Sequence, residues 1–458
     1  FISEYNGIKI TLTVFVPMDE NIEIWNFEIE NKTRSNRSLS IYTYFEWCLG
    51  SSSDHHREFH KTFLETHFDP KLNCMTATKR LWEIPLGDRG HWNIEYPYLG
   101  FISCSNKITD YDGDKDTFIG QYGTIQTPKG ISEKHLSKKL GKWNDSVAAV
   151  KTDVHLKQNE NKTINFFIGI KEDKNSIASS LKKFSTAKSI KQALTDVKLF
   201  WQKMFDTLVI ETPDGGMNLL VNKWLRYQAI AGRLWGRTAY YQQSGAFGFR
   251  DQLQDSLVFL PIDPKKTLDQ IKLHARHQFE DGTVLHWWHP ISETGLPTKM
   301  TDDLLWLPFI ITQYLDETAD YKILSIKESY YDNKNKKDSL YDHSVAAIEK
   351  VLTRLSKRGL TLIGAGDWND GLSAVGLEFK GESIWLTEFF YLILVRFAEI
   401  AKSTGRIDHY KRYSQKANQL KKAFDKYAWD GDWFWRATKD DGKKVGSKSS
   451  PEGKIYLN

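Results

Sequence analysis

The chain has 458 residues, which at roughly 100–200 residues per domain predicts two to four domains. It carries 63 Lys and Arg against 58 Asp and Glu, and the basic residues are scattered along the sequence, which argues against nucleic-acid binding. The mean hydropathy is −0.50, and the longest apolar runs, such as that in Leu304–Leu315, are far shorter than the roughly 18–20 residues that span a bilayer. We therefore expect a soluble protein that binds neither nucleic acid nor membrane.

Cysteine is scarce and tryptophan is abundant. Cys48, Cys74 and Cys104 have the spacing of neither a metal-ligand pair nor a disulfide framework, so we expect a reducing, cytoplasmic location. The 16 Trp, 20 Tyr and 25 Phe make the chain 13% aromatic. Flat apolar rings with a polar edge are typical of large cores and of clefts that stack against sugars.

The first part of the chain, residues 1–175, predicts an antiparallel β-sandwich. β-Branched and aromatic residues alternate with polar ones over short runs, and turn-forming residues separate these runs. The runs are Ile8–Phe15, Glu23–Ile29, Ser38–Phe45 and Lys162–Ile170, and the turn signals include Asn6-Gly7, Asp112-Gly113-Asp114 and Asn159-Glu160-Asn161.

Residues 176–210 change to a helical period. An apolar stripe with the spacing of one helix face runs among lysines, which predicts a helical linker. The stripe consists of Ile177, Leu181, Ile190, Leu194, Val197, Phe200 and Met204.

Residues 211–458 predict an antiparallel array of long helices whose Gly-, Trp- and His-rich loops carry the chemistry. The chain stops just after the apolar run Ile455–Leu457, and we expect both of its ends to be truncated relative to the functional protein. The expected helices are Met217–Arg237, Thr267–His277, Asp302–Glu317, Leu340–Arg358, Ser383–Thr404 and His409–Tyr427.

The densest group of reactive side chains lies in Gly364–Gly371, between two expected helices. Glycines on both sides allow a tight turn that gathers two carboxylates, an amide and an indole. One interpretation is an Asx-turn in which the aspartates cap backbone N–H groups. The other is a catalytic loop, in which Trp368 removes water from a carboxyl group and so favours the protonated form that a general acid needs.

A second group, Tyr240–Asp255, follows Arg233 and Arg237. Arg250 and Asp251 are adjacent, so their side chains diverge and can meet different partners. They can recognise a carboxylate or a sugar hydroxyl, or they can satisfy loop backbone groups. Arg237 lies near the end of its expected helix and can also neutralise the helix C-terminus.

A third group combines His286–Pro290 with Thr301–Pro308. Thr301 or Asp302 before an apolar helix is typical of an N-cap. Two histidines three residues apart, without a glutamate or a third ligand, are a weak zinc signal, so we expect no metal. The sequence also lacks the Gly-rich loops that bind nucleotides and the Gly-x-Ser-x-Gly elbow of serine hydrolases.

Together these motifs resemble the inverting disaccharide phosphorylases of glycoside hydrolase family 94, the cellobiose and cellobionic acid phosphorylase group, and the phosphorylase-like part of cyclic β-1,2-glucan synthases. The resemblance implies an N-terminal antiparallel β-sandwich, a helical linker and an (α/α)6 barrel that is incomplete in this chain. It rests on Phe118–Gly123, Gly248–Gln252, Asp302–Pro308, Gly366–Gly371 and Lys380–Ser383, in this order.

The resemblance also implies roles for individual residues. Asp370 is the expected general acid, and Arg250, Asp251, Trp368 and Asp303 are the expected substrate-binding residues. An upstream arginine is expected to bind phosphate, and the spacing favours Arg237, with Arg233 in reserve. No cofactor is implied, because inorganic phosphate is a co-substrate.

The implied function is phosphorolysis of a β-glucoside with inversion, giving α-glucose 1-phosphate, by a homodimer. Cellobiose phosphorylases carry an additional arginine where this chain has Ser244–Ala246, which favours cellobionic acid or a related β-linked oligosaccharide. The family's phosphate-binding His and Thr would lie beyond Asn458. Alternatives are an inverting β-glycoside hydrolase, a phosphorylase-like domain acting on β-1,2-glucan, a carbohydrate-binding module and an interaction scaffold.

Overall fold

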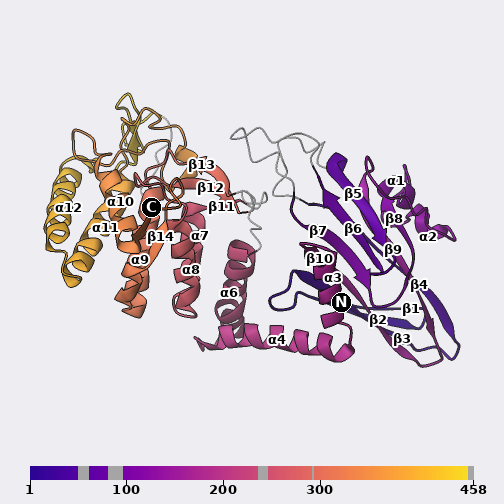
Figure 1. The fold of residues 1–458 in the computed structure, drawn as a ribbon. Coiled ribbons are helices and arrows are strands. Elements are labelled where there is room, and N and C mark those ends of the chain that lie inside the picture. Colours follow the sequence, from indigo (N-terminus) through magenta and orange to yellow (C-terminus); the bar gives the residue numbers. More distant parts are fainter. Residues whose placement is uncertain (50–60, 81–95, 236–245, 291–292, 452–458) are drawn as a thin grey trace. The chain divides into compact units, whose positions relative to one another are not determined.

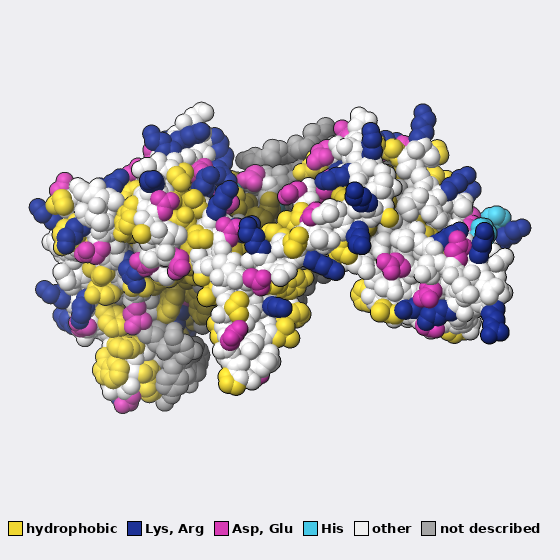
Figure 2. All heavy atoms as spheres, turned by 90° about the horizontal axis from the view of Figure 1, so that it is seen from below, with side chains coloured by type: hydrophobic (Ala, Val, Ile, Leu, Met, Phe, Trp, Pro, Cys, Tyr) yellow, Lys and Arg dark blue, Asp and Glu magenta, His cyan; other side chains and the backbone are white. Residues whose placement is uncertain are grey.

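The computed structural model describes residues 1–49, 61–80, 96–235, 246–290 and 293–451. The chain forms two compact units, Phe1–Lys203 and Met204–Asn458, each with its own hydrophobic core. On the face shown in Figure 2, Lys and Arg side chains are interspersed with Asp and Glu side chains. No helix in the described ranges is long and apolar enough to cross a membrane.

The first unit contains two antiparallel sheets (Figure 1). Alternating residues from both sheets, among them Ile29, Phe166 and Val150, are buried in one core, as the period-two pattern predicts. All four strands expected from the sequence are present. The larger sheet has the order β1 (Ile2–Tyr5), β2 (Ile8–Phe15), β3 (Ile22–Asn31), β10 (Asn161–Lys171), β7 (Leu99–Cys104), β6 (Cys74–Lys79), β5 (Leu64–Asp69); the smaller has β4 (Arg37–Glu46), β9 (Ser146–Leu156), β8 (Ile108–Asp114).

The turn predictions have different outcomes. Asn6 and Gly7 both have positive φ, 47° and 72°, and join β1 to β2 in the way that hairpins favour. Asp112–Asp114, predicted as a turn, instead ends strand β8, so that prediction was wrong.

The physical reason is a set of partners from a distant loop. Asp112 accepts hydrogen bonds from Ser137 and from the Lys139 backbone, and Asp114 pairs with the Lys139 ammonium group. Asp110, two residues before Asp112, accepts a 2.9 Å hydrogen bond from the Leu136 backbone N–H. Aspartate is normally disfavoured in strands, and these hydrogen bonds stabilise the three aspartates in strand β8.

Helices α3 (Lys174–Lys183) and α4 (Ala187–Asp206) occupy the segment predicted to be a helical linker. Ile177, Phe184 and Ile190 pack with Phe101 and Phe167 of the larger sheet in a second core. The boundary between the compact units lies within α4, after Lys203.

The second unit is dominated by helices, as the sequence predicts. The segment expected as one helix, Met217–Arg237, is a helical run with wide π-type turns up to Trp235, and its last two residues lie outside the described ranges. The helices are α5 (Gly215–Leu219), η4 (Leu220–Trp224), α6 (Leu225–Tyr227), η5 (Gln228–Trp235), α7 (Phe249–Asp255), α8 (Pro264–Ala275), α9 (Asp303–Thr318), α10 (Leu340–Leu352), α11 (Ile384–Ser403) and α12 (Ile407–Tyr427).

Helix α9 is the centre of this unit and contacts α7, α8, α10 and α11 (Figure 1). Six consecutive residues at its start, Asp303–Pro308, are all buried, and they cover more than one full turn, which is typical of a helix enclosed by other helices. Helix α11 begins after Ser383, whose hydroxyl accepts from the Leu386 N–H, and α10 begins with a capping box of Ser339 and Asp342.

Short strands bring the sequence motifs together at one end of these helices. Strand β11 (Phe247–Gly248) pairs with β12 (Leu285–His289), and β12 pairs with β13 (Thr294–Pro297). Single bridges join Met300 to Gly364 and Ser383 to Ala437. Loops that are distant in the sequence thereby meet at the N-terminal ends of α7, α9 and α11.

Candidate active site

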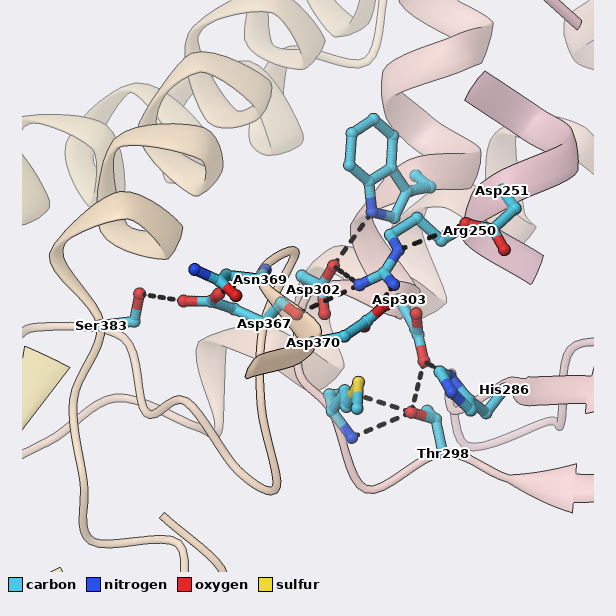
Figure 3. Close-up of polar contacts among 12 residues, drawn as sticks. Arg250, Asp251, His286, Thr298, Asp302, Asp303, Asp367, Asn369, Asp370 and Ser383 are labelled. Carbon is cyan, nitrogen blue, oxygen red and sulfur yellow. Dashed lines mark hydrogen bonds and ion pairs between the residues drawn. The ribbon is translucent and has the colours of Figure 1, made fainter. Parts of the chain in front are cut away.

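Three motifs converge on the guanidinium group of Arg250 (Figure 3). Arg250 lies in the first turn of α7 and is 6% exposed. Its Nη2 donates to Asp370 Oδ1 at 2.6 Å, and its Nη1 donates to the Asp367 carbonyl at 3.1 Å and to Asp302 Oδ2 at 3.3 Å. Burial opposes the charge, but the negative field of Asp302 and Asp303 and the bond to Asp370 raise the pKa of Arg250. The guanidinium is therefore a fixed cation around which the motifs assemble.

Asp302 is fully buried beneath Arg250. Burial first, and then the charge of Asp303, raises the pKa of Asp302 to about 7, although Arg250 acts in the opposite direction. Its Oδ2 also accepts from Trp306 Nε1 at 3.2 Å, while its Oδ1 has no partner among the described residues. Asp302 occupies the N-cap position of α9 without a side-chain cap bond in the described structure, so its carboxylate serves the site rather than the helix end.

Asp303 and His286 form a second pair beside Arg250. Asp303 is fully buried; its Oδ2 lies 2.8 Å from His286 Nδ1 and accepts a 2.5 Å hydrogen bond from Thr298 Oγ1. Burial opposes protonation of His286, but its bond to Asp303 and the charge of Asp303 raise the pKa of the imidazole. Asp303, expected to bind substrate, is therefore not exposed at the surface. It contacts His286, which is partly exposed.

The loop Gly364–Gly371 combines one buried and one open carboxylate. The Asp367 carboxylate is fully buried and receives hydrogen bonds from Ser383 Oγ at 2.6 Å and from Arg436 Nη1 and Nη2 at 2.7 and 2.6 Å. The Asp370 side chain is 68% exposed. The two aspartates of the motif therefore occupy opposite environments.

Trp368 does not bury Asp370 as expected. Its ring is half exposed and lies 6.3 Å from the Trp385 ring, between centroids. The expected loss of water around the Asp370 carboxyl is thus absent in this structure. The close neighbour of the Asp370 carboxylate is instead the guanidinium group of Arg250, with which it forms an ion pair.

The other predicted residues lie nearby or outside the described ranges. Asp251 is partly exposed, with its Oδ1 3.8 Å from Arg250 Nε. Arg233 pairs with Asp255 at 3.1 Å. Arg237, the expected phosphate ligand, lies in the segment 236–245, outside the described residues.

Two family descriptions match the chain. The description "Glycosyl hydrolase 94 superfamily, catalytic domain" matches residues 200–458, and "Glycosyl hydrolase 94, supersandwich domain" matches residues 1–187. The chain belongs to the glycosyl hydrolase 94 superfamily. The family predicted from the sequence motifs is thus confirmed.

Several curated relatives of this family 94 chain are similar over almost its whole length. It is 30% identical to the cyclic β-(1,2)-glucan synthase NdvB of Rhizobium meliloti over 99% of the chain and 16% of that protein. It is 27% identical to solabiose phosphorylase of Paenibacillus borealis (99% of the chain, 56% of the relative) and 25% identical to cellobionic acid phosphorylase of Neurospora crassa (100% and 56%). The chain thus spans about half the length of these phosphorylases.

A solved structure shares the fold of this family 94 chain. A bacterial glucoamylase complexed with acarbose superposes with a TM-score of 0.58 at 12% identity, covering 94% of the chain and 58% of the glucoamylase. At this low identity, the likeness shows the fold alone.

In this family 94 chain, no sequence motif predicts Arg436 or the site role of His286. Arg436 lies in a short aromatic stretch without a recognisable motif, and only the bridge between Ser383 and Ala437 brings it to the loop. The sequence around His286 offers only a weak HxxH zinc pattern. Both histidines of that pattern lie on strand β12, where His286 contacts Asp303.

Proposed function

We propose that this chain carries the donor-sugar pocket and the general acid of an inverting glycoside phosphorylase, with Asp370 as the acid. The observation that carries the proposal is that Asp370 presents a solvent-open carboxyl group at the point where Arg250 brings the three sequence motifs together. Membership of family 94 and the phosphorylases among its relatives support this proposal.

The proposed reaction breaks one bond and forms one. A phosphate oxygen attacks the anomeric carbon from the face opposite the leaving group, while the glycosidic C–O bond breaks and leaves its electrons on oxygen. Asp370 gives its proton to that oxygen, and solvent returns a proton to the carboxylate. Inversion converts a β-glucoside into an α-sugar 1-phosphate. Phosphate is already anionic, so this route needs no carboxylate to activate the nucleophile.

The remaining residues have supporting roles in this proposal. Trp368 offers a half-exposed ring on which a sugar face can stack, and Arg250 and Asp251 offer a donor and an acceptor for its hydroxyls. Asp303 acts through His286. Arg237 stays the proposed phosphate ligand.

The proposed substrate is cellobionic acid or a related β-linked oligosaccharide. Ser244–Ala246, where cellobiose phosphorylases have an arginine, disfavours cellobiose. A second candidate, a β-1,2-glucan, is favoured by the 30% identity to a cyclic β-(1,2)-glucan synthase over 99% of the chain.

The architecture and assembly of the proposed enzyme follow the family. We propose that the second unit belongs to an (α/α)6 barrel, in line with the packing of α11 against α12 across a short connection. We also propose a homodimer, which light scattering coupled to gel filtration tests directly.

The competing enzyme activity is hydrolysis. An inverting hydrolase needs a second carboxylate roughly 6.5–9.5 Å from the acid to activate water. We therefore propose to measure sugar 1-phosphate and free glucose released from cellobionic acid, cellobiose and β-1,2-linked oligoglucosides, with and without inorganic phosphate. Product that requires phosphate is expected. Equal glucose release in both conditions would favour the hydrolase.

The role of Asp370 is tested by Asp370→Asn, which keeps the side-chain shape but cannot donate the acid proton. General acid catalysis contributes roughly 10²–10⁴-fold, so we expect kcat on the disaccharide to fall by about that factor. The matched control is Asp269→Asn, at an exposed position on α8, which should retain full activity. Undiminished turnover by Asp370→Asn would remove Asp370 from the mechanism.

A further inference from the structure

We propose that Arg436 is a positioning residue, which fixes the proposed acid Asp370 by holding the buried Asp367, three residues earlier in the same loop. This inference rests on the proposed function of Asp370 and adds a residue far from the recognised motifs. It is carried by three observations: the grip of Arg436 on Asp367, the relay from Asp367 to the backbone around Asp370, and the rigid setting of Arg436.

Arg436 binds Asp367 with both arms of its guanidinium group. Nη1 donates to Asp367 Oδ2 at 2.7 Å and Nη2 donates to Asp367 Oδ1 at 2.6 Å. The arginine is 4% exposed and the aspartate 0%. Such a two-point contact fixes the direction of the carboxylate as well as its position, and no lysine can reproduce it.

The Asp367 carboxylate passes this constraint to the acid through two consecutive Asx-type turns. Its Oδ1 accepts from the Asn369 backbone N–H at 3.0 Å, and Asn369 Oδ1 accepts from the Gly371 backbone N–H at 3.0 Å. Asp370 lies between these two fixed amides. Its backbone position therefore follows from the orientation of Asp367.

Two arginines thus hold the loop from opposite ends. Arg436 binds the buried Asp367 side chain. Arg250 binds the Asp367 carbonyl and the solvent-exposed Asp370 carboxylate (Figure 3). The single contact with Arg250 does not fix the position of the Asp370 side chain, because that side chain is 68% exposed to solvent.

The surroundings keep Arg436 itself in place. Its carbonyl accepts from the Ile384 N–H at 3.1 Å, and its N–H donates to the Val445 carbonyl at 2.9 Å. Its Nη1 also donates to Ser383 Oγ at 3.1 Å, the group that caps α11. Its guanidinium centre lies 6.0 Å from the ring of Trp385, which neighbours Trp368.

The inference predicts a loss that depends on the leaving group. A disaccharide needs Asp370 to protonate its departing oxygen, but a glycosyl fluoride does not. In that case a phosphate oxygen bonds to the anomeric carbon while fluoride leaves with the electrons of the C–F bond. A variant that misplaces only the acid should therefore lose the first reaction and retain the second.

We propose to compare the full-length wild type with Arg436→Met, Arg436→Lys and Asp367→Asn on the disaccharide it cleaves and on β-glucosyl fluoride. Misplacing a catalytic group by about 1 Å costs on the order of 100-fold, so kcat on the disaccharide should fall about 100-fold in Arg436→Met. Turnover of the fluoride should fall less than about 5-fold, and KM should change little. Arg436→Lys should recover only a small part of the loss.

The matched control is Arg412→Lys. Arg412 also makes a two-point contact, to Glu349 at 2.7 and 2.5 Å, and links α12 to α10 away from the loop. It should leave the ratio of the two reactions unchanged. If Arg436→Met does not fold, Asp367→Asn and Arg436→Lys decide the question by the same ratio.

The outcomes separate this inference from the function on which it rests. Equal losses on both substrates, or no loss on either, overturn the positioning role of Arg436. A wild type that cleaves the disaccharide only by hydrolysis overturns phosphorolysis, while the ratio of disaccharide to fluoride turnover still tests Arg436. A wild type that cleaves neither substrate overturns both proposals.

Discussion

At the scale of single residues, the site is a network of ion pairs centred on the buried Arg250. Arg250 partly neutralises the negative charges of Asp302, Asp303 and Asp370. For Asp302, burial and the charge of Asp303 both disfavour the ionised form. A carboxyl whose pKa is higher in the folded than in the unfolded chain stabilises the fold at low pH. That contribution is lost as the pH rises through the folded-state pKa.

Asp302→Asn should therefore change the pH dependence of stability. The wild type should lose stability relative to Asp302→Asn between about pH 4, the unfolded pKa, and about pH 7, the folded pKa. At about 1.4 kcal/mol per pKa unit the difference reaches at most about 4 kcal/mol. Denaturant titrations from pH 4 to pH 8 measure it, with Asp269→Asn as the exposed control. A difference in unfolding free energy that does not vary with pH would contradict the prediction.

At the scale of elements, periodicity predicted most of the fold. Ile8–Phe15 was predicted to the residue, and the expected helices over α8 to α12 overlap the observed ones, because apolar spacing reports which face is buried. The wrong turn at Asp112–Asp114 has the opposite origin. Its stabilising partners lie in a loop some 25 residues further along the chain, which local propensity cannot register.

The candidate site was predictable to the same extent. Asp370 and Arg250 lie in dense local motifs, and the structure brings them into contact. Arg436 lies in no such motif. It reaches the site through the pairing of Ser383 with Ala437, which forms only in the folded chain. Likewise, the sequence could not show that Asp303 faces inward.

Helix α9 offers a test of the packing. Leu305 is fully buried among the surrounding helices, so Leu305→Ala should destabilise the protein by about 2–5 kcal/mol. Leu392→Ala, on α11 at a position 40% exposed, should cost clearly less. Chemical denaturation of the two variants provides the comparison. Equal losses would mean that α9 is not the centre of its core.

At the scale of the whole molecule, the main cores of the two compact units are separate. Phe166 and its neighbours fill the core between the sheets, whereas Leu305 and its neighbours fill the helical core. Because cooperativity follows shared packing, each unit should unfold in its own transition.

Calorimetry of core variants tests this expectation. Phe166→Ala should lower the temperature of one transition and Leu305→Ala that of the other, each leaving the second transition nearly unchanged. A shift of both transitions by either variant would show instead that the units unfold together.

The ion pair between Arg436 and Asp367 has a consequence for folding while the chain is being synthesised. Roughly 70 residues separate the two, so at about 5–20 residues per second Asp367 is made several seconds before its partner. During that interval the nascent chain holds a carboxylate destined for burial without the cation that neutralises it. The loop Gly364–Gly371 can therefore settle only after the ribosome has added Arg436. A growing chain therefore gains the final geometry of the proposed acid late, well after all the recognised sequence motifs have been synthesised.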